Sequence, residues 1–92
     1  INVLREDQED ISTGFATAGE KFFDTVNYSV SDLGNPILNE ALAIFQCTKE
    51  TIHDGGDHVI FVCRVISAHQ DPLSDPLLYY RGKYSTISKT VT

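Results

Sequence analysis

The apolar stretch at residues 59–66, Val-Ile-Phe-Val-Cys-Arg-Val-Ile, constrains this chain more than any other feature. Five apolar residues precede Arg64 and two follow it, a pattern typical of a strand covered on both faces. Gly55 and Gly56 lie shortly before it, and such a step gives the backbone a turn and lets it approach a ligand closely. We therefore expect a central strand that begins beside two polar side chains, Asp57 and His58, placed for chemistry or for capping.

Length and composition restrict the class of protein. With 92 residues the chain forms one small domain, residues 1–92. The formal net charge of −6 argues against nucleic acid and anionic membranes as partners. No apolar run is long enough to cross a bilayer, and the first residues do not form a signal peptide. Cys47 and Cys63 lie in strand-like runs, which favours free thiols in a cytoplasmic protein over a disulfide. The sequence has no methionine, even at position 1, so we expect a processed or truncated chain.

The order of the remaining elements predicts a mainly β fold. Residues 1–4 have the pattern of the end of a strand, and Ile11, Phe15 and Ala18 follow an acidic cluster at helical spacing. Residues 41–52 predict a strand that forms an antiparallel hairpin with residues 59–66, and a last strand covers residues 77–81. Strand, helix and then several strands with short turns suggest a barrel or sandwich with a helix on its side. Neither a GxGxxG nor a Walker motif is present, so a nucleotide would not be held in the Rossmann manner.

The segment from His53 to His58 permits three interpretations. In a two-residue hairpin His53 would face His58 and Asp54 would face Asp57, which would group four possible metal ligands. The two carboxylates would repel each other without an ion, and no third imidazole lies nearby in the sequence. A solvated turn is the second interpretation. A turn that contacts a ligand is the third, and we favour it.

A second segment, Tyr-Tyr-Arg-Gly-Lys-Tyr at residues 79–84, mixes aromatic rings with two basic residues. Such a set can stack on a planar ring and meet an anionic phosphate. The same pattern also describes an amphipathic strand whose tyrosines cover the edge of a core. The pattern alone favours the amphipathic strand.

Two motifs that occur in order resemble a known family. Gly-Asp-His-Val-Ile-Phe-Val at residues 56–62 and Pro-Leu-Leu-Tyr-Tyr-Arg-Gly-Lys-Tyr at residues 76–84 look like the closing half of the flavin reductase-like domain, the reductase component of two-component flavin monooxygenases. Residues 2–8 are similar to the Asn-x-Leu-x-x-x-Gln segment of that family. The resemblance covers Ile1 to about Tyr84. It implies an FMN-binding split barrel, a Greek-key antiparallel barrel, that is incomplete at its N-terminus because the family domain begins well before Ile1.

The resemblance also implies a function. Such a protein passes a hydride from NADH or NADPH to FMN or FAD, usually as a homodimer, and reduced flavin then reaches a partner oxygenase. The alternative is a non-catalytic module of the same fold that binds flavin, haem or only a protein partner. In the family the Gly-Asp-His turn lies beside the nicotinamide and the Asn-x-Leu segment lies along the flavin. The residues that carry over as cofactor contacts are Asn2, Val3, Leu4, Arg5, Gly56, Asp57, His58, Arg81 and Tyr84.

Two further expectations concern the central strand. Cys63 and Arg64 stand where the family commonly has a glycine and an acid, which changes the packing and charge of the strand's second half. A small barrel has only one inside, so a strand that is apolar on both faces needs a second cover. We expect the face bearing Ile60, Val62 and Ile66 to pack on a second subunit. Arg64, on that same face, would then need a carboxylate or carbonyl partner.

Overall fold

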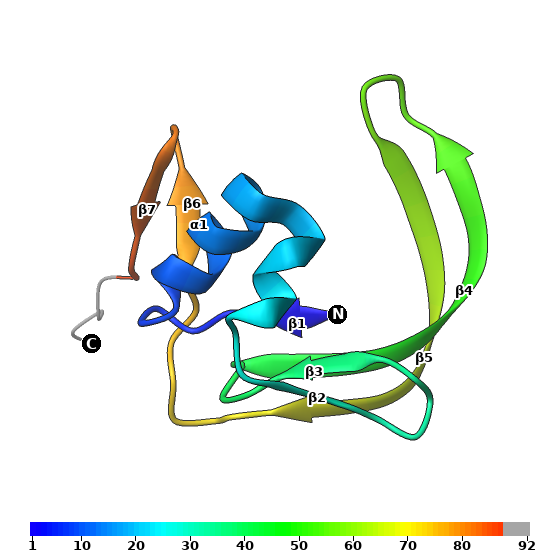
Figure 1. Cartoon of the computed structure of the whole chain (residues 1–92), viewed down its shortest axis with the longest axis horizontal. Coiled ribbons are helices and arrows are strands. Elements are labelled where there is room, and N and C mark those ends of the chain that lie inside the picture. Colours follow the sequence, from blue (N-terminus) through cyan, green and yellow to red (C-terminus); the bar gives the residue numbers. More distant parts are fainter. Residues whose placement is uncertain (88–92) are drawn as a thin grey trace, which may run out of the picture.

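The computed structural model describes residues 1–87 and confirms a mainly β fold with one α-helix (Figure 1). Antiparallel pairing joins its strands into three small sheets, β1-β4-β5, β2-β3 and β6-β7. In chain order the elements are β1 (Asn2–Val3), α1 (Glu9–Ala18), the 3₁₀ helix η1 (Gly19–Asp24), β2 (Tyr28–Val30), β3 (Pro36–Leu38), β4 (Ala43–Asp54), β5 (Val59–Gln70), β6 (Leu78–Tyr80) and β7 (Lys83–Ser85).

The long hairpin of β4 and β5 dominates the structure, as the sequence predicts, although both strands extend beyond the predicted ends. Its register differs from the prediction at the turn. Asp54 pairs with Val59 and His53 with Ile60, so His53 does not face His58. Two register shifts, between Gln46 and Cys47 and between Lys49 and Thr51, interrupt the expected alternation of faces along β4.

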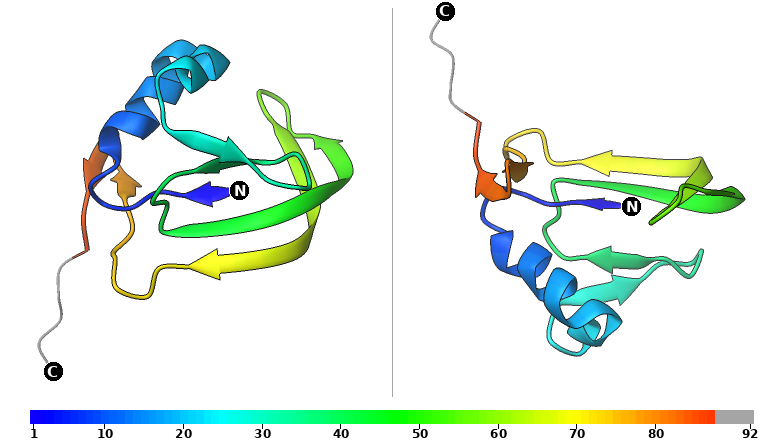
Figure 2. Two further views of the ribbon diagram at one scale, coloured as in Figure 1. Left: turned by 60° about the horizontal axis from the view of Figure 1, so that its bottom comes forward. Right: turned by 90° about the horizontal axis from the view of Figure 1, so that it is seen from above.

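The β2-β3 sheet lies beside the lower half of this hairpin, and the β6-β7 sheet lies apart from it, beside α1 (Figure 1). From one side to the other, Figure 2 shows the helices, then β2 and β3, then β1 and β4, then β5. The sequence did not predict β2 and β3, which are each three residues long and pair antiparallel across the turn between them. The Asn35 side chain in this turn donates a hydrogen bond to the Cys47 carbonyl oxygen at 3.3 Å, which ties the turn to β4.

Gly14 has a packing role inside α1. A β-carbon at this position would overlap the ring of Phe22 in η1. The helix therefore accepts a residue of poor helix propensity so that the two helical segments can approach each other closely. Phe22 and Phe23 both make edge-to-face contacts with Phe15, with ring centroids 5.2 and 4.8 Å apart. This aromatic cluster holds η1 against α1.

Few side chains are buried. Within residues 1–87 the buried apolar side chains are Leu38 and Ala41, and the buried polar one is Gln8. Within residues 1–87 neither face of the residue 59–66 strand is covered, because Ile60 is 48 % exposed and Phe61, on the opposite face, is 58 % exposed. The upper part of the hairpin bends away from the other elements (Figure 1), so nothing within the described residues covers it. The last five residues, 88–92, lie outside the described residues.

Candidate functional site

The first group of predicted site residues, Asn2 to Arg5, runs through the middle of the fold. On one side the Leu42 N–H donates to the Val3 carbonyl oxygen at 2.7 Å. On the other side the Leu77 N–H donates to the Leu4 carbonyl oxygen at 3.0 Å, and Arg5 forms a bridge with Pro76. The segment therefore connects β4 with the start of β6, and its backbone is fixed from both sides.

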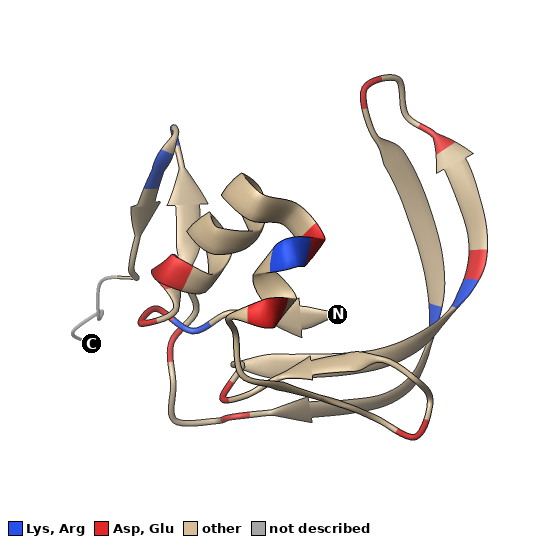
Figure 3. Ribbon diagram, viewed as in Figure 1, with Lys and Arg blue, Asp and Glu red and all other residues tan. Residues whose placement is uncertain are grey.

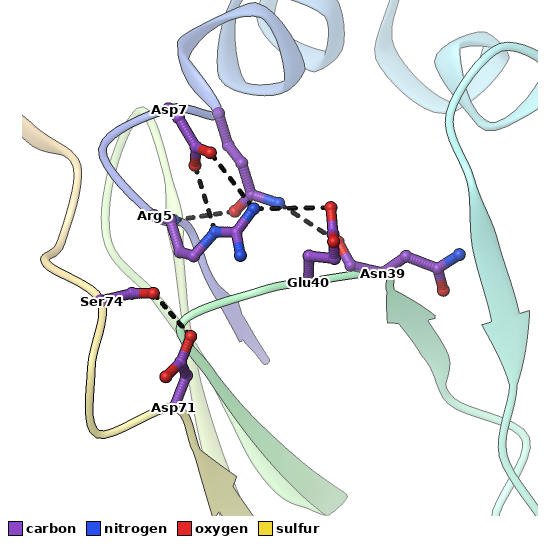
Figure 4. A network of polar contacts seen from close by, with 7 residues as sticks. Arg5, Asp7, Asn39, Glu40, Asp71 and Ser74 are labelled. Carbon is purple, nitrogen blue, oxygen red and sulfur yellow. Dashed lines mark hydrogen bonds and ion pairs between the residues drawn. The ribbon is translucent and has the colours of Figure 1, made fainter.

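The Arg5 side chain is held by acids rather than left free for a phosphate. Its guanidinium lies 3.1 Å from Asp7 and 3.5 Å from Glu40, as Figure 4 shows. Glu40 adopts a left-handed backbone conformation with φ of 63°, which is uncommon for a residue other than glycine. This cation links the loop before α1 to the loop before β4.

The second group lies on the β6-β7 hairpin. Arg81 and Gly82 form its two-residue turn with φ of 52° and 76°, and positive values at both central residues define a type I′ turn. The Arg81 guanidinium lies 5.2 Å from the centre of the Tyr80 ring. The Tyr84 hydroxyl lies 2.8 Å from the Ser12 hydroxyl, so it joins β7 to α1. The predicted strand at residues 77–81 thus ends in a turn, with Arg81 exposed at its tip.

The third group is the tip of the β4-β5 hairpin. Gly55 lies opposite His58, because its N–H donates to the His58 carbonyl oxygen at 2.9 Å. A β-carbon on Gly55 would lie 2.6 Å from the His58 Nε2 atom, so the absent side chain is what lets the imidazole lie over the backbone. The His58 Nδ1 atom is 2.9 Å from the Asp57 carboxylate. Both side chains are exposed, and Gly56 adopts φ of 83° with open space around it.

These three groups do not form one site within the described residues. Residues 2–5 are hydrogen-bonded to the segment that leads into β6, which places the first two groups on neighbouring elements. The hairpin tip projects away from both groups in Figure 1. A site that uses all three groups needs atoms from outside residues 1–87 or from a second copy of the chain.

Other possible sites are weaker. An open groove of about 820 Å³ between α1 and η1 is lined in part by the acidic residues Glu6, Asp7, Glu9 and Asp10. Acidic residues lie on many elements and basic ones on few (Figure 3), and this groove offers no cation for a phosphate. No three His, Cys, Asp or Glu side chains in residues 1–87 are grouped to hold a metal ion. Cys47 and Cys63 are free thiols, and they pair with Val65 and Lys49 rather than with each other.

One polar residue with a clear structural role was not among the predicted site residues. Gln8 is 5 % exposed, accepts a hydrogen bond from the Arg5 N–H at 2.8 Å and donates one to the Asn39 carbonyl oxygen at 3.2 Å. The available signal was the glutamine at the end of the Asn-x-Leu-x-x-x-Gln motif. Nearby, the Ser74 hydroxyl donates to Asp71, as Figure 4 shows, and the Leu73 N–H donates to the same carboxyl group. These hydrogen bonds lower the pKa of Asp71.

Comparison with known proteins gives a consistent result. The family model of the flavin reductase like domain matches residues 1–88. The chain is 38% identical to the reductase subunit HsaB of a flavin-dependent monooxygenase from Mycobacterium tuberculosis, and the match covers 100% of this chain and 50% of that protein. It is 37% identical to the FMN reductase (NADH) SmoA of Agrobacterium fabrum, with coverage of 97% and 50%. The chain thus spans about half the length of these relatives.

A solved structure agrees with these sequence matches. The NADH:FAD oxidoreductase SgcE6 of Streptomyces globisporus C-1027, in complex with NAD and FAD fragments, superimposes with a TM-score of 0.86 at 31% identity. The match covers 95% of this chain and 53% of that one. The fold is therefore the expected split barrel, with open sheets in the described residues. In that same region no helix is long and apolar enough to span a membrane. By its motifs, its fold and the match over residues 1–88, the chain belongs to the flavin reductase-like domain family.

Proposed function

We propose that the protein carrying this chain is a flavin reductase, which transfers a hydride from NADH or NADPH to FMN or FAD. The reduced flavin would serve a partner monooxygenase, as the names of the reductase subunit HsaB and of the NADH-dependent FMN reductase SmoA suggest. The observation that carries the proposal is the exposed hairpin tip, where the His58 Nδ1 atom lies 2.9 Å from the Asp57 carboxylate and Gly55 leaves room for the imidazole.

The tip fits a nicotinamide better than a metal. His58 and Asp57 offer polar atoms to a carboxamide or ribose, and Gly56 leaves its backbone open to a ring. Hydride transfer between two cofactors needs no acid or base from the protein. The task of Gly56, Asp57 and His58 is then to hold the nicotinamide in place.

The flavin half of the site is assigned to residues 2–5, with Arg81 and Tyr84 at its border. The segment presents a rigid backbone and the half-buried side chains of Val3 and Leu4, which suit the flat apolar face of an isoalloxazine ring. The Arg5 charge is already balanced by Asp7 and Glu40, so we assign the grip on the flavin phosphate to residues outside this set.

A homodimer completes the proposal. Ile60, Val62 and Ile66 are each about half exposed, and their face needs a cover. Arg64 on this face has the expected carboxylate partner, because its Nε atom lies 2.6 Å from Glu50. With that charge balanced, we propose that the face packs on a second subunit. The two free thiols further support a cytoplasmic location.

The direct test uses the full-length protein with NADH or NADPH and excess FMN or FAD, followed by the near-ultraviolet absorbance of the reduced nicotinamide. We expect turnover with at least one pair. Flavin binding without turnover would instead indicate a non-catalytic module of the same fold.

Two variants test the assignment of the hairpin tip. His58→Ala is expected to raise the KM for the nicotinamide cofactor about threefold to tenfold, the factor carried by one net hydrogen bond, with little change in the KM for flavin. Gly55→Ala should act in the same direction, because its methyl group displaces the imidazole. His53→Ala, on the same hairpin but paired with Ile60, is the matched control. Equal effects on both cofactors would contradict the assignment.

A further inference from the structure

The amide side chains at the two ends of the Asn-x-Leu-x-x-x-Gln segment are hydrogen-bonded to neighbouring parts of the backbone. Asn2 bonds to β3, and Gln8 bonds to Asn39, the residue that follows β3. Asn2 donates from Nδ2 to the Pro36 carbonyl oxygen at 3.1 Å and accepts the Leu38 N–H at Oδ1 at 2.9 Å. Gln8 donates from Nε2 to the Asn39 carbonyl oxygen at 3.2 Å and accepts the Arg5 N–H at Oε1. Each amide thus uses its donor and its acceptor.

These partners fix the orientation of both amides. A carbonyl oxygen can only accept and an N–H can only donate, so Nδ2 of Asn2 must face Pro36 and Oδ1 must face Leu38. The same reasoning fixes Gln8 between Asn39 and Arg5. A flipped amide would place like groups together and lose both hydrogen bonds.

The Asn2 side chain forms the hydrogen bonds that a neighbouring strand would form with the second edge of β3. β3 pairs on one edge with β2, and the Pro36 carbonyl and the Leu38 N–H are two residues apart, so they point to the same edge. The Asn2 side chain satisfies both groups there, while its own backbone pairs with Ile44 in the other sheet. One residue therefore sets the position of β1 relative to β3.

Gln8 anchors the other end of the segment, residues 2–8, through its own side-chain hydrogen bonds. It is buried, and its backbone carbonyl oxygen accepts hydrogen bonds from Ile11 and Ser12 in the first turn of α1. Its side chain holds the Arg5 backbone and reaches Asn39 (Figure 4 shows Arg5 and Asn39). Between these two anchors lie Val3 and Leu4.

We propose that Asn2 and Gln8 are positioning residues of the flavin site, acting through residues 3–5 rather than by contact with the flavin. This inference rests on the proposed flavin reductase function. It replaces a direct contact by the Asn2 side chain, whose donor and acceptor are both already engaged. The two residues share one task, so their substitutions should share one phenotype.

The experiment compares Asn2→Asp, Gln8→Glu and the double variant in the full-length protein. Each single change keeps the acceptor, removes the donor and sets a carboxylate against a backbone carbonyl oxygen. We expect each to weaken flavin binding, measured as the Kd from flavin fluorescence, about threefold to tenfold. The KM for the nicotinamide cofactor should stay constant. Because both anchors hold one segment, the double variant should weaken binding less than the product of the single effects.

Three controls separate positioning from general loss of stability. Asn27→Asp and Gln70→Glu make the same chemical changes at exposed sites. Gly14→Ala strains the helices without touching the segment. The flavin Kd should not move in these variants. A readout that needs no flavin is the hydrogen exchange of the Leu38 and Arg5 amides, which should be faster in Asn2→Ala and Gln8→Ala, respectively.

The outcomes are distinct. A flavin Kd that changes in Asn2→Asp but not in Gln8→Glu would make Asn2 a direct contact and overturn the inference. Unchanged binding in both variants, or equal loss in Gly14→Ala, would overturn it as well. If the unaltered protein neither binds nor reduces flavin, the proposed function itself fails and the inference fails with it, whatever the amide exchange shows.

Discussion

At the scale of single residues, this chain uses glycines to make room for neighbouring rings. Gly55 gives space to the His58 imidazole, and Gly14 gives space to the Phe22 ring. The two cases differ in what must move. The His58 ring is exposed and can rotate away, whereas the Phe22 ring is held against Phe15 in the aromatic cluster. A methyl group should therefore perturb function at Gly55 and stability at Gly14.

We predict that Gly14→Ala lowers the free energy of unfolding of the full-length protein. The collision with Phe22 should cost roughly 1–3 kcal/mol, which outweighs the gain in helix propensity of about 1 kcal/mol or less. Chemical denaturation measures the difference. The double variant Gly14→Ala with Phe22→Leu should recover part of the loss, because the smaller side chain can yield. A stabilised Gly14→Ala protein would show that the ring does not lie over Gly14.

Among the elements, strand β5 carries apolar side chains on both faces over residues 59–66. Val62 and Phe61 lie on opposite faces, and both are about half exposed. The single Lys or Arg on β5, Arg64, is paired with Glu50 on β4, so its charge is balanced if this strand is buried. Contiguous exposed apolar surface of this kind marks an interaction site in soluble proteins.

The homodimer prediction follows from this hairpin. We expect the full-length protein to be a dimer at micromolar concentration by light scattering. Ile60→Asp should dissociate it, because an unpaired carboxylate buried in an apolar interface costs on the order of 3–5 kcal/mol. Ser29→Asp, which adds the same charge to the exposed strand β2, should leave the dimer intact. A monomeric unaltered protein would refute the prediction.

At the scale of the whole molecule, the described residues place the proposed cofactor contacts on separate parts. Residues 2–5 lie at the centre, Arg81 and Tyr84 lie on the β6-β7 hairpin, and residues 56–58 lie at the far tip of the long hairpin (Figure 1). Few apolar side chains are buried between them. Ordering the long hairpin therefore gains little from burial within residues 1–87.

We predict that residues 1–92 expressed alone do not reduce flavin. The exposed faces of β5 and the open sheet edges should make the segment self-associate or aggregate. The measurement is NADH oxidation with excess FMN, beside size-exclusion chromatography, with the full-length protein as the control. Turnover by the segment that matches the full-length protein would mean that its residues suffice for the reaction.

The elements that could be predicted from the sequence are those whose signals are local. The apolar residues 59–66 and the spacing of Ile11, Phe15 and Ala18 each predict a structure from near neighbours, and each is found where expected. The two ordered motifs also sufficed to indicate the family. For the site, the sequence nominated the residues but not their arrangement.

The remaining features depend on contacts between distant parts of the chain. The β-bulges in β4 and the turn register that sets His58 against Gly55 depend on how the two strands pack, and a shift of one residue preserves most of the sequence pattern. The bonds of Asn2 to β3 and of Gln8 to Asn39 join residues more than thirty positions apart. An amide side chain has the same donor and acceptor wherever it lies, so nothing local reveals its partner. It is the fold that brings these two amides to their partners on either side of residues 3–5.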